Sequence, residues 1–193
     1  SSLYLLDVQT MQVEPLVLKD GFMGGAQFSP DGTQVLLTGS PESFGGIGKN
    51  VKEGQTPSTV DTQLYLMNLA DKQITPLTKH FNPCVQRAVW STADGQVYFT
   101  AENRDYISFY RLNPKNGKIQ QIDVKEDLVT GFSLAQSAPV AAYYGQGASN
   151  SDRLYTLDTK KMKQALVEDL SKDILEGIQL GECRSWDFVN AKG

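Results

Sequence analysis

Histidine and cysteine are scarce in this sequence of 193 residues. The only histidine is His80, and the only cysteines are Cys84 and Cys183. A lone loop histidine is more often structural or solvated than catalytic, and two distant cysteines lack the ligand spacing of a zinc site. We therefore expect no bound metal, and two buried free thiols rather than one long disulfide.

Long apolar runs and basic clusters are also missing. The formal net charge is −4, from 18 Lys and Arg against 22 Asp and Glu. A membrane helix needs about 20 apolar residues, and a nucleic-acid surface needs clustered basic residues. We therefore expect neither a membrane nor a nucleic acid as a partner. With 40% hydrophobic and 21% charged residues, the composition is that of an ordinary globular domain.

Motifs for catalysis and nucleotide binding are absent too. The glycine-rich run 45–49 lacks the strand–loop–helix context of a phosphate loop, and no Ser or Thr follows its lysine. The run 145–149 has the wrong spacing for a Gly-x-Ser-x-Gly nucleophile elbow, which occurs nowhere in the sequence. We therefore expect no cofactor and no catalytic residue in these 193 residues.

The sequence does contain a degenerate repeat. The run 3–7 (Leu-Tyr-Leu-Leu-Asp) returns at 64–68, 109–112 and 154–158, and its tyrosines lie at 4, 65, 110 and 155, so the gaps are 61, 45 and 45. Strand-like runs with a period in the low forties are typical of β-propeller blades. Their recurrence predicts that the tyrosines pack between neighbouring blades rather than bind a ligand.

A second marker accompanies the first. The run 28–32 (Phe-Ser-Pro-Asp-Gly) returns as Trp90-Ser91 followed by Asp94-Gly95, and then as Phe132-Ser133. Its Pro and Gly predict a tight turn after the first strand of a blade. We therefore predict an all-β partial propeller of four-stranded antiparallel blades, with strands A to D running outward from the channel. The expected blades are a partial one at 3–18 and three complete ones at 25–78, 84–122 and 129–167.

Two segments fall outside the repeat. The connection 40–62 between strands B and C is far longer than its expected counterparts at 102–107 and 145–152, and a loop of that length is usually functional or disordered. Its apolar residues Phe44, Ile47 and Val51 favour a loop that packs on something. The propeller is expected to fill 1–168. The tail 169–193 is expected to form a short helix at 169–176 and a strand at 182–188.

The order of these motifs resembles the propeller of the prolyl oligopeptidase family of serine peptidases, nearest its dipeptidyl-peptidase and acylaminoacyl-peptidase branches. The turn at 28–32 also occurs in TolB-like propellers. The motifs that narrow the resemblance are Ile74-Thr-Pro-Leu-Thr78, Trp90-Ser91, Gln96-Val-Tyr-Phe-Thr-Ala101, Tyr110-Arg-Leu112, Leu170-Ser171, Ile174-Leu175, and Glu182, Trp186, Asp187, Phe188 and Gly193.

The resemblance implies that the chain is a fragment whose α/β-hydrolase domain, with the catalytic triad, would follow Gly193. It also implies a propeller that caps an active site and limits access to short peptides. Carboxylates would then bind the amino group of a peptide, and arginines would orient its carbonyls. The candidate substrate-binding residues lie on B–C connections: Glu42, Phe44, Glu102, Arg104 and Asp105.

Other interpretations stay open at this point. A non-catalytic TolB-like propeller that scaffolds protein–protein contacts is the main alternative, and the sequence after Gly193 would discriminate between the two. A propeller enzyme with its own site in the channel is disfavoured, since no acid–base or metal set is present. We expect a periplasmic location, with a cytoplasmic one as the alternative, and a homo-oligomer is left open.

Overall fold

The computed structural model describes residues 2–17, 24–182 and 184–191. In these ranges the chain is nearly all β, and its one short helix, α1 (Ser43–Gly46), contains two residues with non-helical backbone angles. The strands are β1 (Leu3–Leu6), β2 (Val13–Val17), β3 (Ala26–Phe28), β4 (Gln34–Gly39), β5 (Gln63–Asn68), β6 (Ile74–Pro76), β7 (Cys84–Trp90), β8 (Val97–Asn103), β9 (Tyr106–Leu112), β10 (Ile119–Ile122), β11 (Leu128–Leu134), β12 (Val140–Gly147), β13 (Asn150–Asp158) and β14 (Lys163–Asp169).

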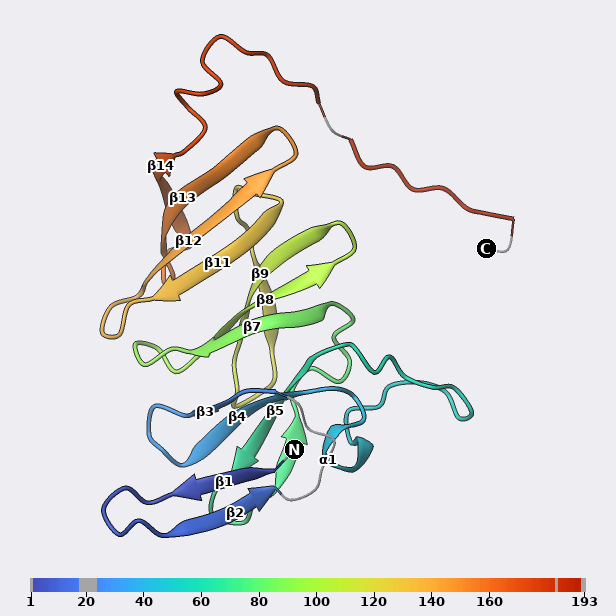
Figure 1. Ribbon diagram of the computed structural model, residues 1–193, viewed down its shortest axis with the longest axis vertical. Coiled ribbons are helices and arrows are strands. Elements are labelled where there is room, and N and C mark those ends of the chain that lie inside the picture. Colours follow the sequence, from blue (N-terminus) through green and yellow to red (C-terminus); the bar gives the residue numbers. More distant parts are fainter. Residues whose placement is uncertain (1, 18–23, 183, 192–193) are drawn as a thin grey trace.

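The strands form antiparallel meanders that follow each other in chain order. We call β3–β6 blade I, β7–β10 blade II, β11–β14 blade III and the pair β1–β2 the partial blade. Figure 1 shows them stacked in a row, from the partial blade at one end to blade III at the other. One parallel pairing, between Leu128 and Ile107, links blades II and III. The predicted three complete blades and one partial blade are confirmed.

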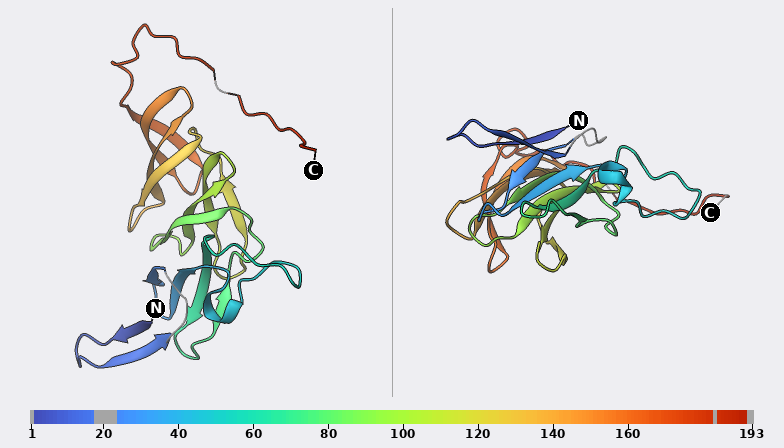
Figure 2. Two further views of the ribbon diagram at one scale, coloured as in Figure 1. Left: turned by 45° about the vertical axis from the view of Figure 1, so that its right-hand side comes forward. Right: turned by 90° about the horizontal axis from the view of Figure 1, so that it is seen from below.

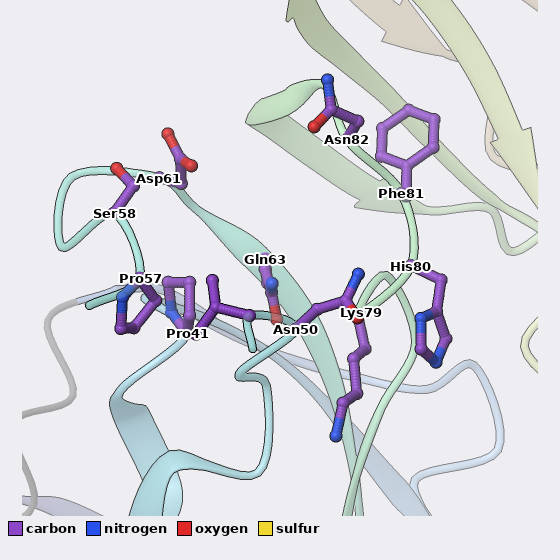
Figure 3. A pocket seen from close by; sticks show the side chains of 11 residues that line it. Pro41, Asn50, Pro57, Ser58, Asp61, Gln63, Lys79, His80, Phe81 and Asn82 are labelled. Carbon is purple, nitrogen blue, oxygen red and sulfur yellow. The ribbon is translucent and has the colours of Figure 1, made fainter. Parts of the chain in front are cut away.

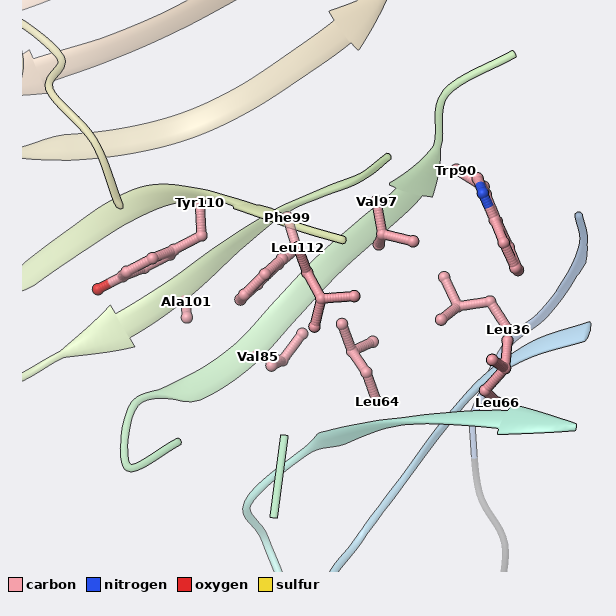
Figure 4. Packing of buried hydrophobic residues seen from close by; sticks show 10 residues of the cluster. All are labelled: Leu36, Leu64, Leu66, Val85, Trp90, Val97, Phe99, Ala101, Tyr110 and Leu112. Atoms are coloured by element: carbon pink, nitrogen blue, oxygen red, sulfur yellow. The ribbon is translucent and has the colours of Figure 1, made fainter. Parts of the chain in front are cut away.

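Alternation along each strand gives every blade two apolar faces. One core cluster joins Leu36, Leu64 and Leu66 of blade I to residues of blade II, among them Val85 and Leu112. Figure 4 shows the two sets pointing toward each other. A second cluster joins blades II and III, and a third joins the partial blade to blade I. The core therefore lies between the sheets, as expected when no sheet can bury both faces alone.

The repeated tyrosines occupy equivalent register positions. Tyr65, Tyr110 and Tyr155 lie opposite Leu37, Phe99 and Tyr143 on the neighbouring strand, and each is buried. Each packs toward the preceding blade, as the clusters show. The predicted packing role is confirmed for these three.

An Asx turn follows each of the four strands that carry a repeated tyrosine, β1, β5, β9 and β13. Its Asp or Asn lies three residues after that tyrosine. The side-chain oxygens of Asp7, Asn68, Asn113 and Asp158 each accept a hydrogen bond from a backbone N–H two residues further on, at 2.8 to 3.0 Å. Such a bond replaces part of the backbone pairing that a tight turn loses. The pKa values of Asp7 and Asp158 lie below the usual range, chiefly because each carboxylate also accepts a hydrogen bond from the backbone N–H three residues further on, that of Thr10 or Lys161.

The second marker of the repeat is an aromatic residue, followed by Ser, at the end of the first strand of a blade. Its predicted position is confirmed in blades I and II and is wrong in blade III. Phe28 and Trp90 lie opposite Val35 and Val97, at the last position of their strands. In blade III the residue at that position is Leu134, whereas Phe132 lies two residues earlier, opposite Tyr143. The pair Phe132-Ser133 resembled the marker because no Asp-Gly turn follows it in blade III to fix the alignment.

The B–C connections of blades II and III are shorter than predicted. Strand β8 runs through Asn103 and β9 begins at Tyr106, which leaves a hairpin of only Arg104 and Asp105. A positive φ of 62° at Arg104 suits a two-residue hairpin turn. Blade III has an equally short hairpin at 148–149. Several of the residues assigned to longer loops, among them Glu102 and Asn103, are instead paired residues at the ends of strands.

The tail also differs from the prediction. Residues 170–178 form turns with isolated hydrogen bonds, such as Leu175 N–H to Ser171 C=O at 2.9 Å, and no helix. A helix this short is marginal in water without an apolar face to bury, and Leu170 and Ile174 are exposed. The expected strand at 182–188 is extended chain without a paired neighbour in its described part, although the rings of Trp186 and Phe188 are in contact, 5.4 Å apart.

The prediction of free thiols rather than a disulfide can be compared with the structure for Cys84 only. Cys84 is a half-buried free thiol at the start of β7, and its Sγ accepts a hydrogen bond from the backbone N–H of Thr62 at 3.4 Å. Cys183 lies outside the described residues.

The equivalent aromatic positions of blades I and II provide a matched stability test. Trp90 is 6% exposed between two blades, whereas Phe28 is 51% exposed. We predict that Trp90→Ala lowers the free energy of unfolding by about 3–5 kcal/mol, because it removes a buried aromatic from an interblade core. Phe28→Ala should cost less than about 1 kcal/mol. Urea unfolding measures both, and equal losses would contradict the interblade assignment.

Candidate functional site

The B–C and D–A connections lie along one side of the row of blades, and we call this side the loop face. It comprises residues 40–62, 77–83, 104–105, 123–127 and 148–149. These connections share one end because successive strands of a meander run in opposite directions. Figure 2 shows the long connection and the tail projecting to the same side.

The first half of the long connection is anchored to blade I. The ring of Phe44 packs edge-on against Tyr65, with centroids 4.8 Å apart. The Tyr65 hydroxyl donates to the Ser40 carbonyl at 2.7 Å. Phe44 has a φ of 57°, which is uncommon for a bulky residue and costs energy unless packing holds it. At Gly48 a Cβ would lie 2.1 Å from the Tyr65 hydroxyl, so only glycine fits there.

The second half of the connection, 50–62, is mostly exposed. Its only regular feature in the described structure is a turn in which the Gln55 N–H donates to the Lys52 carbonyl at 3.0 Å. Val51 and Val60 are exposed, while Pro57 is buried. The boundary between an anchored half and an exposed half therefore lies near residue 50.

A pocket of about 180 Å³ lies between this exposed half and the connection from blade I to blade II. Figure 3 shows Ser58 and Asp61 on one side of the hollow and Lys79 and His80 on the other. Asn50, Gln63 and Asn82 add amide groups to the lining. A hollow with a carboxylate, an ammonium group and several amides can bind a polar ligand that carries both charges. No hydrogen bond joins Ser58 to His80 in the described part of the chain.

The β8–β9 hairpin holds the tail against the loop face. The Ser185 hydroxyl donates to the Asp105 carboxylate, and Arg104 forms an ion pair with Asp187 at 3.7 Å. The hydrogen bond from Ser185, more than the nearby Arg104 charge, keeps the pKa of Asp105 below its usual range. An exposed ion pair of this kind contributes about 0–1 kcal/mol. The tail contact is therefore specific in position but weak.

A buried carboxylate organises the loop face of blade III. Glu126 accepts hydrogen bonds from the Tyr155 hydroxyl at 2.6 Å and from Asn150 Nδ2 at 2.8 Å. Arg153 lies 3.8 Å from Glu126 and forms a closer ion pair with Asp169 at 2.8 Å. A buried carboxylate needs such partners, since its charge is costly to desolvate. The network fixes the start of β13 to the connection from blade II.

That network also reaches the tail. Asn150 follows directly after Ser149, whose hydroxyl donates to the Gly181 carbonyl at 2.6 Å. The tail therefore touches the hairpin of blade III at Ser149 and then the hairpin of blade II at Asp105. It crosses the loop face from one blade to the next.

The five predicted site residues lie in two separate places. Glu42 and Phe44 are at the base of the long connection, where Glu42 pairs with Lys49 at 2.7 Å. Arg104 and Asp105 form the β8–β9 tip. Glu102 is a β8 strand residue, and its carboxylate accepts from Gln86 Nε2 at 2.5 Å.

Sequence reasoning missed the D–A connections as contributors to the site. Lys79 and His80 line the pocket, and Glu126 centres the buried network. The sequence did contain a signal for these residues. Successive strands of a meander alternate in direction, so the D–A and B–C connections lie on the same face. Residue type alone could not separate these positions from other solvated loop charges.

The described residues contain neither a candidate membrane-spanning helix nor a candidate metal-binding cluster. None of the helices there has the length and apolar character that crossing a membrane requires. Nor do three or more His, Cys, Asp or Glu side chains gather there in a way that could hold a metal ion.

Comparison with known proteins identifies the fold. No family model and no curated protein matches the sequence. Among solved structures, the acylaminoacyl peptidase of Pyrococcus horikoshii matches with a TM-score of 0.66 and 20% identity, over 95% of this chain and 25% of that chain. The β-propeller domain of the Trilobed protease from Pyrococcus furiosus matches with a TM-score of 0.63 and 20% identity, over 93% of this chain and 46% of that one.

TolB from Acinetobacter baumannii is similar to a comparable degree. It matches with a TM-score of 0.60 and 20% identity, over 87% of this chain and 38% of that chain. This chain therefore spans less than half the length of each of these three structures. The likenesses show that the chain is a run of β-propeller blades, and the expected resemblance to propellers of the prolyl oligopeptidase family is confirmed at the level of the fold.

The Glu126 network gives a pH-dependent prediction. Burial, together with the hydrogen bond to Glu126, raises the pKa of Tyr155 from 10.0 to about 12. Because the folded state favours the neutral phenol, this stabilisation is complete below pH 10 and is lost as the pH rises toward 12. Tyr155→Phe should therefore show a shallower loss of unfolding free energy across that range.

The same variant has a second expected effect. At neutral pH, Tyr155→Phe leaves a buried carboxylate with one donor fewer, which should cost about 1–3 kcal/mol. Urea unfolding at a series of pH values measures both effects. An unchanged slope above pH 10 would show that folding does not raise the pKa of Tyr155.

Proposed function

We propose that the chain is a non-catalytic, substrate-gating propeller of a serine peptidase of the prolyl oligopeptidase family that acts on short peptides. The observation that carries the proposal is the composition of the loop face. A long connection, a polar pocket and a tail that crosses two hairpins all lie at this one end of the blades. Binding residues on loops held by a rigid scaffold are a common arrangement.

The pocket suits the ends of a peptide. Asp61 can pair with a free amino group, and Lys79 can pair with a terminal carboxylate across the hollow. Arg104 is an exposed guanidinium that can orient a carbonyl, at the cost of its weak pair with Asp187. The exposed half of the long connection would limit the length of peptide that enters.

The partner in this proposal is an α/β-hydrolase domain of the same polypeptide, which would supply the catalytic triad. The similarity to a propeller domain of the Trilobed protease supports such an arrangement. A periplasmic location follows from a role in processing imported peptides, with a cytoplasmic peptidase as the alternative.

A second candidate is a TolB-like propeller that scaffolds protein–protein contacts. The fold match to TolB, at a TM-score of 0.60, favours it to a similar degree. In this case the loop face would bind a protein surface and would show no preference for short peptides.

Peptide binding by the 193-residue chain tests the proposal. We predict that short peptides with free ends shift the amide NMR signals of residues 50–61 and 79–82. Replacement of residues 50–58 by a Gly/Ser linker of equal length should weaken binding at least about tenfold, equivalent to about 1.4 kcal/mol. The replacement begins at residue 50 because Phe44 and Ile47 are part of the core.

The matched control is a Gly/Ser replacement of residues 114–117, a C–D turn on the opposite end of blade II, which should leave binding unchanged. The chain alone should release no product from chromogenic peptide substrates. Signal shifts elsewhere, or none at all, would count against a gating role and favour the scaffold. Hydrolysis that disappears on changing one serine would overturn both.

A further inference from the structure

A hollow of about 560 Å³ lies between blades II and III, on the side of the row opposite the loop face. Its walls are the A–B turns of both blades, the C–D turn of blade III and one residue of β9. Figure 1 shows the β7–β8 and β11–β12 turns on the side of the row away from the β8–β9 hairpin. We call this the turn-side hollow. Its polar lining consists of Asp94, Gln96, Arg111, Thr159 and Lys160.

Arg111 brings a fixed positive charge to the turn-side hollow. It lies on β9 opposite Tyr98 of β8 and Gln120 of β10, so the three side chains share one face of the blade II sheet. Its guanidinium donates to the Gln120 side-chain oxygen at 2.7 Å and to the Thr159 carbonyl at 3.4 Å. Because both acceptors are neutral, these bonds orient the guanidinium without balancing its charge.

The carboxylate that lines the hollow already has donors of its own. Asp94 Oδ2 accepts a hydrogen bond from the Tyr98 hydroxyl at 2.7 Å, and Asp94 Oδ1 accepts one from the Gln96 N–H at 3.0 Å. Burial, more than the hydrogen bond to Asp94, raises the pKa of Tyr98 from 10.0 to about 12. The phenol therefore stays a donor at neutral pH and keeps one oxygen of Asp94 engaged.

Lys160 adds a second positive charge from the blade III side. It lies in the C–D turn, where the Asp158 carboxylate accepts the backbone N–H groups of Lys160 and Lys161 at 3.0 and 2.8 Å. The ion pairs found among residues 2–17, 24–182 and 184–191 include neither Arg111 nor Lys160. Two cations and one engaged carboxylate thus line the hollow, and a bound anion would relieve the repulsion between the cations.

We propose that the turn-side hollow binds a small molecule that carries a carboxylate or phosphate group. Arg111 would offer N–H donors to the oxygens of this group, and Lys160 would pair with it from the other blade. The Gln96 amide can bind a neutral polar part of the same ligand. The hollow has room for more than one anionic group, since ligand pockets measure about 300–1,000 Å³.

Such a ligand would connect blades II and III. Arg111 belongs to β9 and Lys160 to the turn before β14, so a bound anion would add a contact between the two sheets. A ligand that binds only the folded chain also stabilises it by mass action. This inference is independent of the proposed peptidase role, because the hollow and the loop face share no residue.

Titration of the 193-residue chain with inorganic phosphate, and separately with succinate, tests the proposal. At constant ionic strength, the NMR signals of the Gln96 and Lys160 amides and of the Arg111 side-chain N–H should shift and saturate. Signals of residues 50–61 on the loop face should not move. Arg111→Gln should weaken binding at least about tenfold, since it removes hydrogen bonds from a charged group. Lys160→Gln should weaken it about threefold, because its ammonium is exposed.

Two further variants complete the test. Arg111→Lys keeps the charge but loses the planar fork, and should bind more weakly than the parent and more tightly than Arg111→Gln. Lys115→Gln is the matched control, since it removes the same charge from an exposed lysine in the C–D turn of blade II, outside the hollow, and should leave binding unchanged. Circular dichroism verifies that each variant is folded.

The two probes distinguish the ligand classes. Tighter binding of phosphate would indicate a phosphorylated ligand, and tighter binding of succinate would indicate a carboxylic acid. Equal weakening by Arg111→Gln, Lys160→Gln and Lys115→Gln would show only diffuse attraction to surface charge and would overturn the proposal. Shifts that fail to saturate with both probes would overturn it as well.

Discussion

Apolar packing between neighbouring sheets is the interaction on which the rest of this structure depends. Each blade is a twisted meander with apolar side chains on both faces, so it is stable only between two neighbours. Leu36, Leu64 and Leu66 form one side of such a contact, and Val85 and Leu112 belong to the other.

This packing also positions the loop face. Because the blades stack in a fixed order, their B–C and D–A connections converge at one end, where residues far apart in sequence meet. The pocket combines Asp61 with Lys79 across two connections, and the tail reaches Asp105 from Ser185. The anchors of the long connection belong to the same core, since Phe44 packs on Tyr65 between blade I and the partial blade. The site is therefore a product of blade packing rather than of a local motif.

The fold could be predicted from the sequence because period and turn chemistry are local signals. Tyr65, Tyr110 and Tyr155 keep one register, and each is followed three residues later by an Asp or Asn that closes a turn. The tail could not be predicted, because neither a helix at 169–176 nor a strand at 182–188 has a surface to bury its apolar side. The candidate site was predicted only in part: Arg104 and Asp105 stand on the loop face, whereas the role of Glu126 depends on distances that no sequence pattern encodes.

A double-mutant cycle across the contact of blades I and II tests the central claim most directly. Leu64→Ala and Leu112→Ala each remove a buried side chain from opposite sides of one cluster. If the blades pack as described, the two losses of unfolding free energy couple by about 0.5–3 kcal/mol. The pair Leu64→Ala and Leu157→Ala, whose residues lie in different clusters, should be additive within about 0.5 kcal/mol. Additive losses for Leu64 and Leu112 would contradict the account.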